Sequence, residues 1–184
     1  MLNVNFNPFP ILSTERLNLR NIELSDAEDL FVLRSDKRVM AFMDRPLFTA
    51  SEEAAQMIRE IHKAAASNEG ITWAISLKNE SNLIGTISYW RITKEHYRAE
   101  IGYYLHPDYW AKGLMQEALQ PVLEYGFHHM RLHSVEANVN PANTASIRFL
   151  EKNGFVREAY FRENYHYNGQ FLDSAIYSLI VSKK

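Results

Sequence analysis

The segment between Leu105 and Met115 has the composition of a phosphate-binding turn. It leads from an apolar, strand-like stretch into a helical pattern, and Gly113 stands where the backbone must turn sharply. The first turn of a helix presents N–H groups without intrahelical partners at the positive end of the helix dipole, and together these bind phosphate. A single glycine matches neither a Walker loop nor a dinucleotide fingerprint, so a simple turn is the alternative.

A second polar pattern lies on the helix predicted over residues 141–152. Asn140 is expected as its N-cap and Pro141 as its first residue. Asn143 and Ser146 are three residues apart, so an amide and a hydroxyl share one face of this helix. Hydrogen bonds of both side chains to their own helical turn are the alternative to a ligand-binding role.

Glu100 is the first candidate for a general base. It lies on the predicted strand that leads to the glycine turn, and it shares a face with Gly102 and Tyr104. The missing side chain of Gly102 leaves room beside the carboxylate. A solvated glutamate on the outer face of the sheet is the alternative, and Glu136 on the following strand, acting through water, is the fallback base.

Several classes of chemistry are excluded by what the sequence lacks. No cysteine is present, which excludes thiol catalysis and thiolate metal sites. The seven histidines form no zinc-binding pattern and no G-x-S-x-G elbow occurs, so neither a metal nor a serine triad is predicted. Twenty basic and 22 acidic residues give a formal net charge of −2, which disfavours nucleic acid and anionic membranes as partners.

Length and composition favour one globular domain. The 184 residues are 46% hydrophobic and 12% aromatic, enough for a sizeable core over residues 1–184, with residues 1–12 as an irregular leader. The amino terminus lacks the basic start and apolar block of a secretory signal, and no apolar run reaches the roughly 18 residues of a membrane span. We therefore expect a soluble, cytoplasmic protein that is a monomer or a homodimer.

Hydrophobic periodicity predicts the element order β α α β β β α β α β β. Helices are predicted from Ser25, from the capping signal Thr49-Ala50-Ser51-Glu52 to a stop at Gly70, from Gly113 with Pro121 able to kink it, and over residues 141–152. Strands are predicted over residues 16–22, 71–77, 83–92, 98–105 and 134–139, and in a hairpin of residues 156–167 and 171–181 around Asn168-Gly169.

Taken together, these segments resemble the acetyl-coenzyme A signatures of the GNAT acetyltransferase superfamily. The resemblance covers nearly the whole chain and is closest to the RimJ/RimL branch of ribosomal-protein N-terminal acetyltransferases. It rests on Leu12-Ser13-Thr14-Glu15-Arg16-Leu17-x-Leu19-Arg20, Tyr109-Trp110-x-Lys112-Gly113-x-x-x-Glu117-Ala118, Asn140-x-x-Asn143-x-x-Ser146, Lys152-x-Gly154-Phe155, and the ending from Asn168-Gly169 to Tyr177-Ser178-Leu179.

The resemblance implies an α/β GNAT fold, a mixed, twisted, mostly antiparallel sheet flanked by helices. Acetyl-CoA would enter where the strands over residues 98–105 and 134–139 diverge. The implied cofactor-binding groups are the backbone amides of Lys112, Gly113, Leu114 and Met115 for the pyrophosphate, and the strand end at Leu105 with Asn143 for the pantetheine arm.

Two residues depart from the family pattern. Met115 is bulkier than the glycine or alanine that many members carry, and Leu150 replaces the tyrosine that serves many members as general acid. The resemblance places Ser146 near the sulfur, so Ser146 is the expected donor to the leaving thiolate.

The implied reaction is direct attack of a primary amine on acetyl-CoA. An α-amine, with a pKa of about 7.7 to 8.0 against about 10.4 for lysine, is the more nucleophilic acceptor at neutral pH. The resemblance points the same way, to the N-terminus of a ribosomal or other protein. Acetylation of a small-molecule amine or antibiotic, a non-catalytic CoA-binding module and a phosphate-binding regulatory domain are the alternatives.

Overall fold

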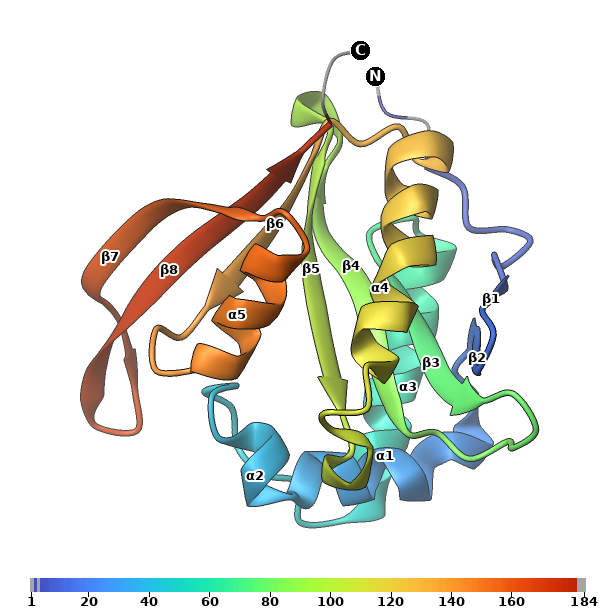
Figure 1. Cartoon of the computed structure of the whole chain (residues 1–184). Coiled ribbons are helices and arrows are strands. Elements are labelled where there is room, and N and C mark those ends of the chain that lie inside the picture. Colours follow the sequence, from blue (N-terminus) through green and yellow to red (C-terminus); the bar gives the residue numbers. More distant parts are fainter. Residues whose placement is uncertain (1, 3, 182–184) are drawn as a thin grey trace.

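A computed structural model, which describes residue 2 and residues 4–181, contains an eight-stranded open sheet flanked by helices (Figure 1). The strand order across the sheet is β1-β2-β3-β4-β5-β6-β8-β7, and only the β5–β6 pair is parallel among the described residues. The predicted mixed, mostly antiparallel sheet flanked by helices is confirmed. The strands are β1 (Leu12–Ser13), β2 (Leu17–Asn21), β3 (Ile71–Leu77), β4 (Gly85–Thr93), β5 (Arg98–Leu105), β6 (Ser134–Val139), β7 (Val156–Tyr167) and β8 (Gln170–Ile180).

Helices cover both faces of this sheet (Figure 1). One face carries α1 (Ala27–Ser35), α2 (Lys37–Met40) and α3 (Ser51–Ala66). The other carries α4 (Leu114–Glu124), which continues into a π-helical turn, and α5 (Thr144–Lys152).

Strand β3 shows why two hydrophobic cores form. Trp73 and Ile75 are fully buried in the cluster that includes α4, whereas Ala74 is buried in the cluster that includes α1 and α3. Successive side chains of a strand point to opposite faces, so an apolar run in a central strand contributes to both layers.

Strands β5 and β6 separate part of the way along the sheet. Their parallel register runs from Arg98 opposite Ser134 to Glu100 opposite Glu136, and the described residues form no β5–β6 pair beyond that point. In Figure 1 the two strands spread apart from the top of the view, β6 towards the lower left and β5 downwards to Leu105. Their facing main-chain groups are then available to an extended ligand.

The helix predicted over residues 141–152 begins later than expected, at Thr144. Asn143, and not Asn140, is its N-cap, and the Asn143 Oδ1 accepts a hydrogen bond from the Ser146 backbone N–H at 3.1 Å. Asn140 instead begins a turn, in which its backbone carbonyl accepts a hydrogen bond from the Asn143 N–H at 2.8 Å. Both asparagines are good caps by type, and the turn decides which one is used.

Other departures from the predicted order are small. A short strand, β1, forms at the end of the expected irregular leader, and α2 is an additional short helix. The first helix begins at Ala27, because Leu24–Asp26 form a 3-10 turn. Pro121 lies inside α4, which continues to Glu124. Within residue 2 and residues 4–181, no helix is both long and apolar enough to cross a bilayer.

Candidate active site

The start of α4 has the geometry of an anion cradle. Gly113 precedes the helix in the left-handed conformation, with φ of 74°. The Glu117 N–H donates the first hydrogen bond of the helix, to the Gly113 carbonyl at 3.0 Å. The N–H groups of the three preceding residues therefore have no acceptor within the helix. The Met115 side chain packs against the core, and the Lys112 ammonium lies 5.5 Å from the centre of the Tyr109 ring.

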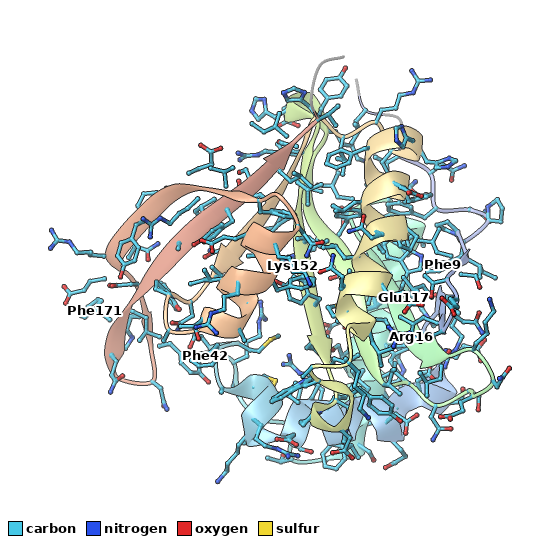
Figure 2. All side chains as sticks on the ribbon, in the orientation of Figure 1. Phe9, Arg16, Phe42, Glu117, Lys152 and Phe171 are labelled. Carbon is cyan, nitrogen blue, oxygen red and sulfur yellow. The ribbon has the colours of Figure 1, made fainter. Side chains whose placement is uncertain are left out.

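A polar clamp fixes this turn from the connection between β1 and β2. The Glu117 carboxylate accepts hydrogen bonds from the Thr14 hydroxyl at 2.5 Å, the Arg16 backbone N–H at 2.8 Å and the Arg16 Nε at 2.6 Å. The Arg16 Nη1 also donates to the Lys112 carbonyl at 3.1 Å. Arg16 and Glu117 lie side by side near the first turn of α4 (Figure 2). The clamp holds both sides of the turn at Gly113.

We expect Glu117→Gln to lower the free energy of unfolding at pH 7 by roughly 1 to 3 kcal/mol, the usual range for a hydrogen bond to a charged group. Burial opposes ionisation of Glu117, but the hydrogen bonds from Thr14 and Arg16 outweigh it and lower the pKa of the carboxyl. This contribution is present above the ordinary glutamate pKa and is lost as pH falls through the lowered value.

Denaturant unfolding of the native protein and Glu117→Gln at pH 7 and at acidic pH measures this difference. The stability gap should shrink at the lower pH. A gap of the same size at both pH values would mean that the charge of Glu117 is not what the clamp uses.

Ser146 hydrogen-bonds to a side chain on the sheet. Its Oγ lies 2.8 Å from the Tyr103 hydroxyl oxygen, and the Tyr103 ring packs edge-on against Phe149. Burial raises the pKa of Tyr103, so the phenol stays protonated and can donate. Tyr103 is a site residue that no sequence motif singles out. Its alternation with Ile101 and Leu105 on β5 was the available signal, because it places Tyr103 on the face that α4 and α5 cover.

The residues expected to hold the pantetheine arm lie beyond the point where the strands diverge, Leu105 at the end of β5 and Asn143 at the start of α5. Asn143 uses its Oδ1 for the helix cap, which leaves its amide NH2 group as the donor. The Leu105 carbonyl already accepts a hydrogen bond from the Trp110 indole at 2.7 Å. The main chain of β5 ahead of Leu105 therefore has more hydrogen-bonding capacity to offer than its last residue.

Glu100 is buried, with 7% of its surface exposed, so it is not a solvated glutamate. The Arg91 Nη1 lies 3.0 Å from the Glu100 Oε2, and the Arg91 guanidinium stacks over the Trp90 ring at 4.2 Å. Burial raises the pKa of Glu100, Arg91 opposes this effect, and the nearby Glu136 adds to it. A carboxylate with a raised pKa is a stronger base for an ammonium proton.

Glu136, the fallback base, lies opposite Glu100 in the β5–β6 register. Its Oε2 lies 3.6 Å from the Arg98 Nη1, and it is more exposed than Glu100. Glu100 is the better shielded of the two carboxylates, and shielding is what strengthens a base.

A cavity of about 840 Å³ lies between α3 and strands β3, β4 and β5. Trp90, Gly102 and Tyr104, which share the sheet face of Glu100, line it. An added Cβ at Gly102 would lie 3.4 Å from the Ser88 Oγ, so the absence of a side chain here leaves space in the cavity. Through Trp90 and Gly102 the cavity adjoins Glu100 on the face opposite to α4.

The arrangement has two sides that meet where β5 and β6 separate. The helix start at Gly113 and the Tyr103–Ser146 pair belong to one face, and Glu100 with the cavity belongs to the other. Among the described residues, no three histidine, aspartate or glutamate side chains are grouped as metal ligands would be. An extended thioester on one face could thus be attacked by a nucleophile from the other.

This fold and site define the class of acetyltransferases with a GNAT fold. The sequence profile of the Acetyltransferase (GNAT) domain matches residues 16–156, and the chain belongs to this family. It is an acetyl-CoA-dependent N-acetyltransferase, so it is an enzyme and not a non-catalytic CoA-binding module.

Individual relatives agree with this assignment. The uncharacterised N-acetyltransferase YoaA of Bacillus subtilis is 36% identical over 96% of this chain and 99% of its own length. The crystal structure of a GNAT-family acetyltransferase from Bacillus anthracis is 30% identical, with a TM-score of 0.82 over 93% of this chain and 98% of that chain. The [ribosomal protein uS5]-alanine N-acetyltransferase of Escherichia coli is 26% identical over 91% of this chain and 89% of its own length.

Proposed function

We propose that this enzyme transfers the acetyl group to an α-amine, and that the N-terminus of a ribosomal or other protein is its acceptor. The relative from Escherichia coli, whose name specifies an alanine of ribosomal protein uS5, supports this choice. The chemistry supports it too, because an α-amine has a pKa of about 7.7 to 8.0 and a large fraction is unprotonated at neutral pH.

Acetyl-CoA is proposed to bind on the α4 face. The backbone amides from Lys112 through Gly113 and Leu114 to Met115 would receive the pyrophosphate, and the helix dipole would favour its charge. The pantetheine arm would lie along the free edge of β5 towards Leu105, with the Asn143 amide as a donor from α5.

Acetyl transfer then needs one proton acceptor and one donor. Glu100 is proposed to take the proton of the attacking amine, directly or through water. Ser146, held by the Tyr103 hydroxyl at 2.8 Å, is proposed to donate to the thiolate that leaves when the carbonyl intermediate collapses. The amine nitrogen gains the acetyl group, the C–S bond breaks, and CoA leaves as a thiol.

One observation carries the proposal: the buried Glu100 and its adjoining cavity lie across the sheet from the helix start at Gly113. A base on the acceptor side and an anion cradle on the cofactor side are what direct transfer requires.

Thiol release from acetyl-CoA with a panel of short peptides tests the α-amine assignment. Peptides with a free N-terminus should be acetylated, and the same peptides with a blocked N-terminus and an internal lysine should not. Equal rates for both sets would assign the enzyme to ε-amines instead.

A small-molecule amine is the second candidate acceptor. Its support is the size of the cavity, since about 840 Å³ lies within the usual range of small-ligand sites, roughly 300 to 1,000 Å³. Free amino acids and aminoglycosides in the same assay separate this candidate from a peptide acceptor.

We expect Ser146→Ala to lower kcat on the order of 10-fold, which is the loss of about one hydrogen bond in the transition state. The loss stays moderate because the Tyr103 hydroxyl remains nearby. The acetyl-CoA affinity should change little, since an interaction made mainly in the transition state affects turnover. Calorimetric titration and steady-state kinetics of the same preparation provide both numbers.

Tyr103→Phe and the double variant complete a mutant cycle. If the two hydroxyls act as one donor chain, the double variant should be less impaired than the product of the single losses. Near-normal turnover of Ser146→Ala, or a loss confined to affinity, would reduce Ser146 to a structural role.

A further inference from the structure

Arg34, in the last turn of α1, is a buried charge that the reaction above does not use. Only 5% of its surface is exposed, and it lines the cavity between α3 and the sheet. Its Nε has no hydrogen-bond acceptor, and no carboxylate pairs with its guanidinium, among residue 2 and residues 4–181. Buried arginines are normally paired, so this one needs an explanation.

The neighbours of Arg34 supply no negative charge. Its guanidinium lies 4.8 Å from the centre of the Phe48 ring, a contact that leaves the in-plane N–H groups unused. Arg45 also lines the cavity, and its positive charge cannot compensate that of Arg34. Burial lowers the pKa of Arg34 and the charge of Arg45 lowers it further, while Tyr104 opposes them.

Three acidic residues of α3, Glu52, Glu53 and Glu60, also line the cavity, but they are exposed on its rim and bind other groups. Glu60 accepts a hydrogen bond from the Gln56 Nε2 at 3.3 Å. Glu52 pairs with Arg59 at 3.0 Å. Glu53 accepts hydrogen bonds from the Thr49 backbone N–H at 2.8 Å and caps its own helix. The buried guanidinium of Arg34 is therefore not paired with any of these carboxylates.

We propose that the acceptor carries an oxyanion, a carboxylate or a phosphate, and that Arg34 binds it. This inference rests on the proposed function and names its substrate class: an amine that also bears a negative group. The Arg34 guanidinium offers paired N–H donors whose fork geometry fits a carboxylate or phosphate.

The cavity places the two ends of such an acceptor apart. Arg34 and Phe48 line it on the side of α1, and Trp90 and Gly102 line it on the side next to Glu100. The amine belongs beside Glu100, where its proton is removed, and the oxyanion belongs beside Arg34. Arg45 is exposed and lines the same cavity, so it attracts the same anion from solvent.

Matched acceptors that differ only in the negative group test the proposal by thiol release. The pairs are Ala-Asp-Ala-amide with Ala-Asn-Ala-amide, alanine with alaninamide, and phosphoethanolamine with ethanolamine. In the native enzyme, kcat/KM should favour the anionic member of at least one pair by 10-fold or more. The peptide pair, the amino-acid pair and the phosphate pair also distinguish the sources of the oxyanion.

Variants assign the preference to Arg34. Methionine has similar length and no charge, so Arg34→Met should bring the anionic-to-neutral ratio close to one, and Arg34→Lys should keep part of the preference. Arg157→Met, which removes the same charge from an exposed position on β7 outside the cavity lining, should leave the ratio as it is. A ratio near one in every pair of the native enzyme, or a ratio that survives Arg34→Met, would overturn the proposal.

A binding measurement separates this inference from the proposed reaction. Calorimetric titration of the native protein with CoA present should show that N-acetylalanine binds at least 10-fold more tightly than N-acetylalaninamide. If no acceptor releases thiol above the rate of acetyl-CoA hydrolysis, the proposed acceptor chemistry fails while this titration still tests Arg34. Equal binding of the two acetylated compounds would refute the oxyanion site even in an active enzyme.

Discussion

Glu100→Gln is expected to lower kcat at neutral pH by roughly 10²- to 10⁴-fold, the range that a positioned general base contributes. The substitution keeps the size of the side chain but removes its ability to accept a proton. Glu100 is buried beside the cavity, and the burial that raises its pKa makes it a better acceptor for an ammonium proton than an exposed glutamate. The fold should survive, since glutamine can still receive the Arg91 donor.

The pH dependence identifies the role more sharply than the rate at one pH. In the native enzyme the rate should rise through the raised pKa of Glu100, where the carboxylate forms. In Glu100→Gln this rise at acidic pH should disappear from the pH–rate profile. Part of the activity should return at high pH, where the amine loses its proton unaided. Steady-state kinetics of both proteins over a broad pH range provide the comparison.

Two variants serve as controls for this assignment. Arg91→Met removes the charge that holds the pKa of Glu100 down, so the acidic limb should move to higher pH. Glu136→Gln should have a small effect, because Glu136 is the more exposed carboxylate. If Glu100→Gln has a native pH profile, or if Glu136→Gln is the more damaging change, the proton goes to Glu136 or to solvent.

The strands were predictable from the sequence because their side chains alternate and their ends carry turn residues. Ranges 71–77, 98–105 and 134–139 agree with β3, β5 and β6, and Asn168-Gly169 forms the expected hairpin turn with both residues at positive φ. These signals are local, since they depend on the face that each residue turns to the core.

The less predictable features depend on residues far apart in the chain. Whether Asn140 or Asn143 caps α5 is decided by the turn between them, which composition does not reveal. Tyr103 meets Ser146 across 43 positions, and the contact exists only once β5 and α5 pack together. In the sequence Arg34 has the pattern of an ordinary helical arginine, and it is buried only because α3 and the sheet pack around it. Long-range packing, and not propensity, creates these sites.

Gly113→Val is expected to weaken acetyl-CoA binding on the order of 100-fold, because a β-branched residue held at positive φ is strained by roughly 1 to 3 kcal/mol and the turn must shift to relieve it. The strain comes from the backbone, since φ at Gly113 is 74° and the nearest described atom to an added Cβ would be the Arg16 Nη2 at 3.7 Å. The proposed cradle is made of main-chain N–H groups, so a shift of the turn moves the donors themselves. Calorimetric titration with acetyl-CoA measures the loss.

Gly169→Val provides a matched control, because Gly169 has φ of 81° with no described atom within 4 Å of an added Cβ, and it lies at the hairpin tip. It introduces the same kind of strain away from α4, so its stability should fall while its acetyl-CoA affinity stays native. Lys112→Ala should cost less than about threefold, because a backbone cradle does not need that ammonium. A Lys112→Ala loss as large as that of Gly113→Val would show that a side-chain charge carries the site, and the main-chain cradle would then be the wrong account of how the pyrophosphate is held.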